Sequence, residues 1–333
     1  MDRTTAEKKW LRRISGGKSA VPRRKPTSDQ TSDQSSSKPR PKPQPTAKKH
    51  GNGFGDIAGM EDLKQRVKEG FINVLQHRDL ADAYGIRPPS MLFYGPAGCG
   101  KTFFAEKMAE EVGIHFIKVV PDDLASTMVH GTQEKIGEVF KNAERHAPAL
   151  LFFDEFDAMV PRRTGNEYNQ HYDSEVNEFL CMLNHASDKG VYVLAATNHP
   201  ERIDKAVLRT GRIDELVYVD MPDHEARKSL FALELAKLPR EEDIDMDRLA
   251  HLTQGFNCSD INYIVKSAAR KKFNEAIGCG EHTLQNITQK QLEEIISGRS
   301  PSVSSRDLRE YQRVHREFSP KDKGGQPASI GFR

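Results

Sequence analysis

A glycine-rich run, Gly95-Pro-Ala-Gly-Cys-Gly-Lys-Thr102, ends in a basic residue and a hydroxyl residue. It fits the pattern GxxxxGK[ST], in which a loop turns its backbone N–H groups toward phosphate oxygens at the start of a helix. Lys101 adds a positive charge for the β and γ phosphates, and Thr102 supplies a hydroxyl to Mg²⁺. The residues predicted to bind a nucleoside triphosphate are therefore Gly95, Pro96, Ala97, Gly98, Cys99, Gly100, Lys101 and Thr102.

Two adjacent carboxylates, Asp154 and Glu155, follow the apolar run Leu150-Leu-Phe-Phe153. Such a run predicts a buried strand, and open α/β sheets place their ligand chemistry at the carboxyl ends of strands. We expect Asp154 to hold Mg²⁺ through water and Glu155 to polarise an attacking water. Asn198 follows the apolar run Val193-Leu-Ala-Ala196 and can orient that water beside the terminal phosphate. Two acids beside a bound triphosphate predict hydrolysis.

Short apolar runs alternate with helical periodicity from residue 51 onward, which is typical of a parallel sheet covered by helices on both faces. The predicted strands are Met91 to Tyr94, His115 to Val120, Leu150 to Asp154, Tyr192 to Thr197 and Leu216 to Val219. The predicted helices between them are Thr102 to Val112, Gln133 to Arg145 and Ser174 to Ala186. This arrangement would bring the loop 95–102, Asp154 and Asn198 to one edge of the sheet.

The strand pattern ends after Pro222, and amphipathic helical patterns follow it. They cover Glu225 to Lys237, Met246 to Thr253, Ser259 to Ile277 and Thr288 to Ile296. A last helix is expected from Ser304 to Phe318, with Ser304 as its N-cap. The predicted fold class is therefore an α/β parallel sheet of the P-loop NTPase type, flanked by helices and followed by a small helical lid domain.

A basic N-terminal segment precedes an acidic remainder. Residues 1–50 contain 14 Lys or Arg and 4 Asp or Glu, a net charge of +10, which leaves 36 against 44, a net charge of −8, for residues 51–333. Residues 15–53 have almost no large apolar side chain, so they cannot bury enough surface to offset the entropy of ordering. We interpret this segment as a solvated, disordered arm. A docking peptide around Trp10 or a nucleic-acid contact is the alternative.

The composition argues against several classes of protein. The longest apolar run, Ala147 to Phe153, is far shorter than the roughly 18 residues that a membrane span needs. No apolar core follows Met1, so a secretory signal is not expected. The four cysteines stand singly, without the spacing of a disulfide framework or a zinc site. We therefore expect a soluble, cytoplasmic protein without membrane insertion.

Together these segments resemble the AAA family of ATPases, in the classical branch that includes katanin, spastin and the proteasomal ATPases. The resemblance covers about residues 54–318. It implies that the backbone near Ala58 contacts adenine and that Asn198 stands at the sensor-1 position. It also implies that Arg209 and Arg212 are arginine fingers. Such fingers act on a neighbour's nucleotide, so the resemblance further implies a homo-oligomeric ring, usually a hexamer.

Two further segments extend this resemblance with departures from it. Gly255-Phe-Asn-Cys-Ser-Asp-Ile261 is similar to the start of the family's lid helix, so Cys258 and Ser259 are expected at the nucleotide, although the family usually has Gly and Ala there. The family's pore loop matches Met128-Val129-His130, where an aromatic residue is usual. Met128 and Val129 could still grip a peptide through apolar contact. The missing aromatic residue favours local remodelling or disassembly of a partner over processive threading.

The sequence thus predicts an oligomeric ATPase that uses ATP and Mg²⁺ and remodels an unidentified protein substrate. The alternative is a nucleotide-gated oligomeric scaffold that acts on DNA through the basic arm, with ATPase activity that duplex DNA stimulates. The expected division is a disordered arm over 1–53, an α/β ATPase domain over 54–222, a helical lid domain over 223–299, a C-terminal helix over 300–318 and a flexible tail over 319–333.

Overall fold

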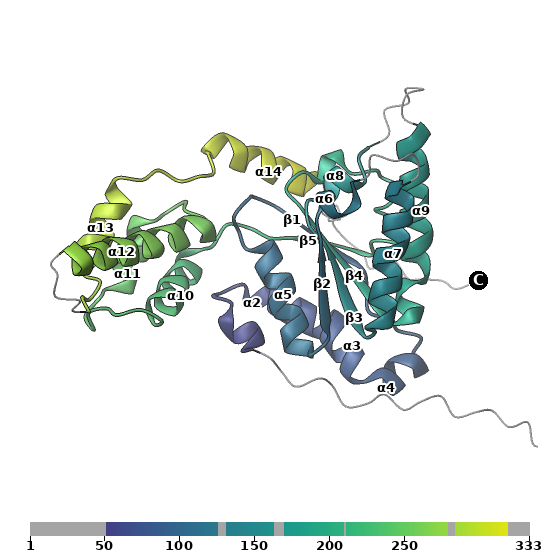
Figure 1. Ribbon diagram of the computed structural model, residues 1–333, viewed down its shortest axis with the longest axis horizontal. Coiled ribbons are helices and arrows are strands. Elements are labelled where there is room, and N and C mark those ends of the chain that lie inside the picture. Colours follow the sequence, from purple (N-terminus) through teal and green to yellow (C-terminus); the bar gives the residue numbers. More distant parts are fainter. Residues whose placement is uncertain (1–50, 126–130, 163–169, 210, 279–283, 319–333) are drawn as a thin grey trace, which may run out of the picture. The chain divides into compact units, whose positions relative to one another are not determined.

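Five apolar segments pair as one parallel sheet in the computed structural model, which describes residues 51–125, 131–162, 170–209, 211–278 and 284–318 (Figure 1). In spatial order the strands are β2 (His115–Val119), β3 (Ala149–Phe153), β4 (Val191–Thr197), β1 (Met91–Tyr94) and β5 (Glu215–Tyr218). Every pairing in the sheet is parallel. The predicted strands are confirmed, with ends that differ by one residue at most.

The side chains of the central strands alternate between two apolar cores, one on each face of the sheet. On β3, Leu151 and Phe153 belong to one core, whereas Leu150 and Phe152 belong to the other. Successive side chains of a strand point to opposite faces, so both faces of this sheet must be covered. In contrast, β2 pairs with β3 alone, and its Lys118 is exposed at the edge of the sheet.

Helices cover both faces of the sheet, as predicted (Figure 1). Phe104 and Met108 pack one helix against the face that carries Phe152. Phe140 and Phe179 pack two other helices against the face that carries Phe153. Phe179 meets Phe153 of β3 edge to face, with ring centroids 4.9 Å apart. The three helices are α5 (Lys101–Val112), α7 (Gly131–Arg145) and α9 (Gln170–Ala186).

Residues 61–83 form helical elements that the sequence pattern did not predict. They are α2 (Glu61–Val67), a π-helical turn (Lys68–Ile72), α3 (Asn73–Gln76) and α4 (Arg78–Ala83). Val67, Phe71 and Ile72 are buried. Because the π turn holds more residues than an α turn, the buried side chains leave the 3.6-residue period by which helices are recognised. Two further short helices, α6 (Pro121–Leu124) and α8 (Phe156–Met159), are also new.

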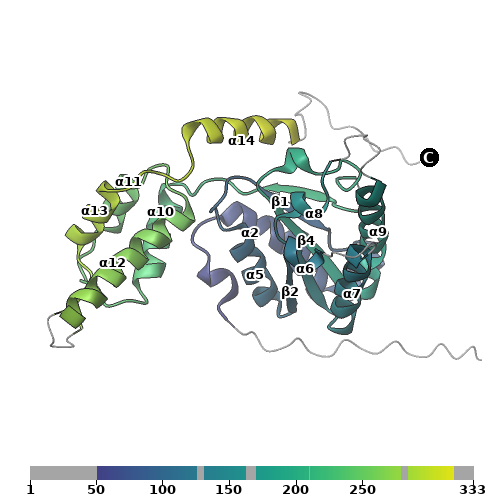
Figure 2. The same ribbon diagram turned by 45° about the horizontal axis from the view of Figure 1, so that its top comes forward.

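Four helices that follow Pro222 share a core of their own (Figure 2). Phe231, Leu249, Ile264 and Leu292, one from each helix, are fully buried in it. The helices are α10 (His224–Leu235), α11 (Met246–Leu252), α12 (Cys258–Gly278) and α13 (Gln289–Ser297). Acceptor side chains of Asp223, Asp245 and Thr288 cap three of their N-termini. Helical structure after Pro222 was therefore predicted correctly for the described part of that segment.

The last described helix, α14 (Ser305–Phe318), begins at the predicted cap. The backbone N–H of Asp307 donates to Oγ of Ser304 at 3.2 Å, and the Ser304 hydroxyl donates to the Asp307 carboxylate at 2.7 Å. The Ser304 backbone N–H also donates to Oδ2 of Asp307 at 3.2 Å, so two backbone N–H groups at this N-terminus have side-chain partners. The prediction for Ser304 is confirmed.

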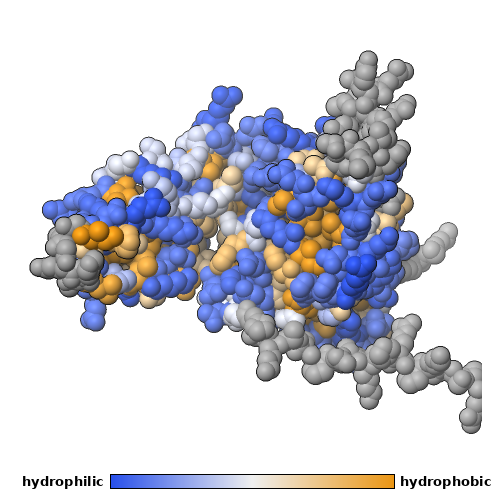
Figure 3. All heavy atoms as spheres, viewed as in Figure 1, coloured by the Kyte–Doolittle hydropathy of each residue, from blue (hydrophilic) through white to orange (hydrophobic). Residues whose placement is uncertain are grey.

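The surface carries hydrophobic areas among hydrophilic ones (Figure 3). The most exposed large apolar side chains include Tyr84 on the α4 side and Phe273 on α12. Within the described residues, no helix combines the length and the apolar character that crossing a membrane requires.

Candidate nucleotide-binding site

The loop between β1 and α5 adopts a backbone that requires its glycines. Gly95, Gly98 and Gly100 have φ angles of 143°, 75° and 88°, a region that other residues rarely adopt. A Cβ on Gly95 would lie 2.2 Å from the Val219 carbonyl oxygen, and one on Gly98 would lie 2.5 Å from Nδ2 of Asn257. The strand, loop and helix predicted around this motif are confirmed, and α5 begins at Lys101.

Lys101 is buried and folds back onto its own loop. Its Nζ donates to the carbonyl oxygens of Gly95 at 2.9 Å and Pro96 at 2.8 Å. Burial lowers the pKa of Lys101 to about 8, while the charge of Asp154 acts in the opposite direction. The ammonium therefore has poor solvation in the site and would gain from an anion placed against the loop.

The predicted Mg²⁺ ligands meet across the sheet edge. Oγ1 of Thr102, in the first turn of α5, donates to Oδ2 of Asp154 at 3.0 Å. The hydroxyl and the carboxylate are oxygen donors, which are the ligands that Mg²⁺ prefers. Lys118 reaches the same carboxylate oxygen from β2, with its Nζ at 2.8 Å. The donor set therefore fits the metal, and the sequence reasoning missed Lys118.

Glu155 stands in a strained position directly after β3. Its φ and ψ of 51° and 45° are left-handed, which is uncommon for a residue with a side chain. Its backbone N–H donates to Oδ1 of Asp154 at 3.1 Å, and it precedes α8 as the N-cap residue. Its carboxylate is exposed. Strained backbone of this kind concentrates at functional sites.

The end of β4 forms the next part of this edge. Thr197 is buried, and its Oγ1 donates to Oδ1 of Asp157 at 2.5 Å and accepts the backbone N–H of His199 at 2.8 Å. Asn198 lies between these fixed neighbours and is partly exposed. Because β3 and β4 pair in parallel, Glu155 and Asn198 follow neighbouring strand ends, as the sequence predicted.

The start of α12 contacts the phosphate loop from the other side. Nδ2 of Asn257 donates to the Ala97 carbonyl oxygen at 3.0 Å, and the Ser259 backbone N–H donates to the Gly98 carbonyl oxygen at 3.1 Å. Asn257 is 2% exposed and also caps α12, since its Oδ1 accepts the N–H of Asp260 at 2.8 Å. Sequence reasoning missed Asn257, although an Asn three residues before an Asp is a capping signal.

A polar network continues from α12 toward α14. Asp260 is 1% exposed, and its carboxylate accepts a hydrogen bond from the Arg299 guanidinium at 2.8 Å and from the Ser302 N–H at 3.0 Å. Further along, Nδ1 of His315 lies 2.9 Å from the hydroxyl of Tyr94, the last residue of β1. The His315 ring also stacks on Tyr218 with centroids 4.2 Å apart. The helix α14 therefore contacts the ends of β1 and β5.

Two cysteines lie at the loop as unreactive thiols. Cys99 is fully buried, its Sγ lies 3.5 Å from Sδ of Met221, and burial raises its pKa to about 12. Burial likewise raises the pKa of Cys258 to about 11. Since the thiolate is the reactive form, neither residue has the environment of a nucleophile. Both contribute packing and backbone to this site.

The two predicted finger arginines differ in their surroundings. Nη1 of Arg212 donates to the Ala206 carbonyl oxygen of its own chain at 2.6 Å, and Arg212 is half-buried. Arg209 is exposed, and within the described residues neither arginine forms an ion pair. Arg209 is therefore exposed to solvent, whereas Arg212 contacts its own loop.

Of the remaining predicted residues, Ala58 belongs to the described part of the chain and the others do not. Ala58 is partly exposed, and its neighbour Gly59 packs so closely on Ala226 that a Cβ would lie 2.6 Å away. The segment at Ala58 thus adjoins the start of α10. The pore-loop residues Met128, Val129 and His130 and the arm with Trp10 fall outside the described residues.

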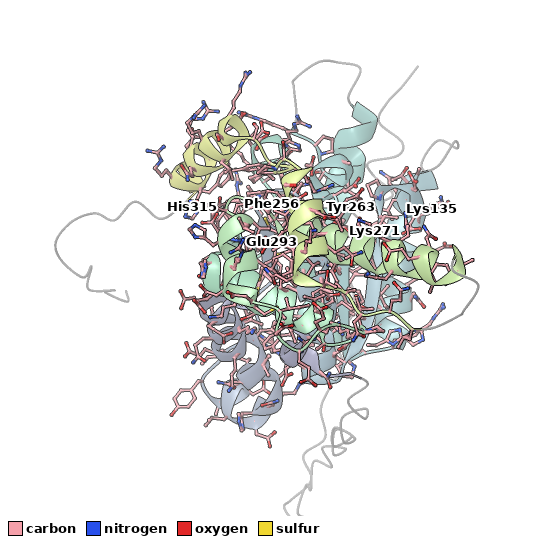
Figure 4. The ribbon with its side chains drawn as sticks, turned by 90° about the vertical axis from the view of Figure 1, so that its left-hand side faces the viewer. Lys135, Phe256, Tyr263, Lys271, Glu293 and His315 are labelled. Atoms are coloured by element: carbon pink, nitrogen blue, oxygen red, sulfur yellow. The ribbon has the colours of Figure 1, made fainter. Side chains whose placement is uncertain are left out.

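A separate pocket of about 480 Å³ opens between α11 and α13. Phe256 and Glu293, labelled in Figure 4, line it together with Leu252, Lys290 and Arg299. It includes no predicted nucleotide-binding residue. His224, Glu225 and Asp247 also come together at the surface, but Asp247 already pairs with Lys228 at 3.1 Å.

A phosphate loop between β1 and α5, with paired acids after β3 and an amide after β4, defines a P-loop nucleoside triphosphatase. Residues 91–221 match the model of the "ATPase family associated with various cellular activities (AAA)". The chain therefore carries the ATPase domain of the AAA family, as its sequence predicted.

Two relatives support this assignment. The Cell division cycle protein 48 homolog of Archaeoglobus fulgidus is 33% identical over 273 residues, which cover 79% of this chain and 37% of that protein. A Plasmodium falciparum protein whose name also refers to a cell division cycle ATPase is 34% identical over 241 residues, 72% of this chain and 19% of that protein. The chain thus spans about a third of the length of the first relative and about a fifth of the length of the second.

Proposed function

We propose that the chain hydrolyses Mg²⁺-bound ATP as an oligomeric ring and couples hydrolysis to the remodelling of a protein partner. The observation that carries the ATPase proposal is the meeting of Lys101, Thr102 and Asp154 at one sheet edge, where the exposed Glu155 follows directly. In this proposal the α/β domain over 54–222 carries the sheet edge, and the lid domain over 223–299 closes over the bound nucleotide.

In this proposal each side chain has a defined task. Lys101 exchanges its carbonyl partners for phosphate oxygens, which relieves an ammonium held in a buried site. Thr102 and Asp154 hold Mg²⁺, which supplies positive charge to the phosphates when bound. Glu155 accepts a proton from the attacking water, and Asn198 orients that water with its amide. The backbone near Ala58 and the residues Cys258 and Ser259 would face the nucleoside.

In this proposal a second subunit supplies the remaining catalytic group, an arginine. The exposure of Arg209 supports a role at a neighbouring subunit's phosphates, since within the described residues it makes no ion pair that would have to break. An arginine supplied in this way stabilises charge in the transition state of phosphoryl transfer. We therefore propose a closed ring, with six subunits as the family resemblance implies. Arg212 would support the loop that presents Arg209.

Dilution tests this proposal directly. A site that is completed by a neighbour hydrolyses ATP only in the oligomer, so turnover per subunit should rise with protein concentration. Phosphate release and sedimentation velocity, measured on the same dilution series, should show activity and assembly rising together. A turnover per subunit that stays constant down to concentrations where sedimentation finds monomers would contradict the ring.

The net charge of +10 on residues 1–50 supports a second candidate, a scaffold that acts on DNA through the arm. Binding through phosphates releases counter-ions, so it weakens steeply with salt. This candidate would be favoured if duplex DNA stimulates the ATPase activity, and if high salt or deletion of residues 1–50 removes that stimulation. Activity that is indifferent to DNA at low salt would exclude it.

A further inference from the structure

The Asp154 carboxylate already has a cation beside it in the described structure. Nζ of Lys118 lies 2.8 Å from Oδ2 of Asp154, and the Thr102 hydroxyl donates to that same oxygen at 3.0 Å. The other oxygen, Oδ1, accepts the backbone N–H of Glu155. The oxygen that would face Mg²⁺ is thus the one that Lys118 neutralises.

Lys118 differs from Lys101, the other lysine of this edge, in how firmly it is held. Lys101 is buried and bonded to two carbonyls, whereas the Lys118 side chain is 42% exposed and pairs with Asp154 alone among the described residues. It rises from β2, the edge strand, so no further strand covers it. A long aliphatic stem on an edge strand lets the ammonium move into water while the stem stays on the protein surface.

We propose that Lys118 is a displaceable counter-ion of Asp154, which holds the carboxylate while no metal is present and competes with Mg²⁺ for it. This inference rests on the proposed function, because it concerns the same metal site. Two positive charges repel each other at contact distance, so Lys118 and the metal cannot both occupy the space at Oδ2. Lys118 would therefore set the Mg²⁺ concentration at which the site loads. It is a positioning residue, since it acts through Asp154.

The expected size of the effect follows from the exposure of the pair. Partly exposed ion pairs contribute little free energy, and the equivalent change in an equilibrium constant is about twofold to fivefold. Replacing Lys118 by Gln removes the charge and keeps most of the stem. The Mg²⁺ concentration that half-saturates nucleotide binding should then fall by about twofold to fivefold.

The test uses the full chain and a fluorescent ATP analogue, titrated with Mg²⁺ at a fixed, subsaturating analogue concentration. The first comparison is Lys118→Gln with Lys118→Arg, in which the retained charge should keep the parent's half-saturation. The second is Lys189→Gln, which removes a similarly exposed lysine outside the site. Lys189 pairs with Glu144 at 2.6 Å. Lys189→Gln should leave the half-saturation unchanged. Thermal melting of each variant should match the parent.

Each outcome decides between named alternatives. An unchanged or raised half-saturation in Lys118→Gln, or an equal fall in Lys189→Gln, would overturn the counter-ion role. Weaker analogue binding by Lys118→Gln at saturating Mg²⁺ would overturn it too, since it would make Lys118 a phosphate ligand. If the parent binds the analogue neither with nor without Mg²⁺, the proposed function itself fails and this inference falls with it.

Discussion

The two halves of the site are built differently, although they share one sheet edge. On the phosphate side, Lys101 is buried, glycines shape the loop, and Asn257 holds the loop from α12. On the proposed hydrolysis side, Glu155 is exposed and has a left-handed backbone. Arg209, which we propose acts in a neighbouring subunit's site, is exposed as well. The first half is organised by contacts within the described chain. The second presents exposed groups, which in our proposal act on water, on the nucleotide and on a neighbouring subunit.

Because the two halves are built differently, we expect substitutions to impair ATP binding and turnover separately. A binding half that is fixed by packing can be damaged only by changes that remove its donors or disturb the loop. The exposed groups of the hydrolysis half can be substituted so that turnover is lost while ATP binding and stability are kept. Variants of each half therefore test whether binding and turnover are separable.

The largest expected effect separates Lys101 from Glu155. Lys101→Ala should weaken ATP binding by a factor of about 100 or more, because several charge-assisted hydrogen bonds to phosphate are lost. Glu155→Gln should keep binding and stop turnover, since an amide cannot accept the proton of water. Isothermal titration calorimetry and phosphate release measure the two quantities. Equal ATP affinity of Lys101→Ala and the parent would refute the phosphate-loop assignment.

For the arginines we expect a large loss of turnover that is less complete than the loss in Glu155→Gln. Arg209→Ala should leave ATP affinity nearly unchanged and lower turnover by a factor on the order of 10³. Mixing Arg209→Ala with Glu155→Gln protein should restore activity, because some junctions then combine an intact Glu155 with an intact Arg209. Phosphate release across mixing ratios, with mixed rings confirmed by native mass spectrometry, checks this.

Arg212→Ala is the matched comparison for Arg209, because it removes the bond to the Ala206 carbonyl within the chain. It should lower thermal stability as well as turnover, whereas Arg209→Ala should lower turnover alone. Full activity in pure Arg209→Ala protein would make that arginine an ordinary surface charge.

The pH dependence of binding reports on Lys101. Its pKa is lowered to about 8, so the free protein loses the ammonium proton as pH rises through about 8. Binding to phosphate then requires proton uptake, and ATP affinity should fall by about tenfold between pH 7 and pH 9. Affinity measured by fluorescence titration across this range tests it. Lys101→Arg, whose guanidinium stays charged, should flatten the profile; a flat profile in the parent would argue against a buried ammonium.

The smallest expected effect concerns Asn257. Asn257→Ser keeps an acceptor for the α12 cap but removes the donor to the Ala97 carbonyl, so ATP affinity should fall by about fivefold with little change in melting temperature. Asn257→Ala also removes the cap and should cost about 1 kcal/mol of stability. Binding titrations and thermal melts on both variants separate the two roles. Identical affinities in the Ser variant and the parent would mean that the contact with Ala97 does not position the loop.

The sheet and the phosphate loop were predictable because each depends on local pattern. Strands buried on both faces have continuous apolar runs in the sequence. The phosphate-loop motif predicts a strand directly before it and a helix directly after it. The helical elements over 61–83 were not predictable, since the π turn at Lys68–Ile72 breaks the helical period. Lys118 and Asn257 were missed for another reason. Their partners, Asp154 and Ala97, are distant in sequence, and only the pairing of β2 with β3 and the placement of α12 bring them together.

The contact between Tyr94 and His315 joins residues that are 221 positions apart. During synthesis, β1 and the phosphate loop leave the ribosome long before α14 exists, and a loop of this length closes slowly against its entropy. If this edge of the sheet folds before α14 is synthesised, the rings of Tyr94 and Tyr218 are left without their contact with His315. Late arrival of α14 would cover this aromatic surface last, so nascent chains that stall before Ser305 would display it to chaperones.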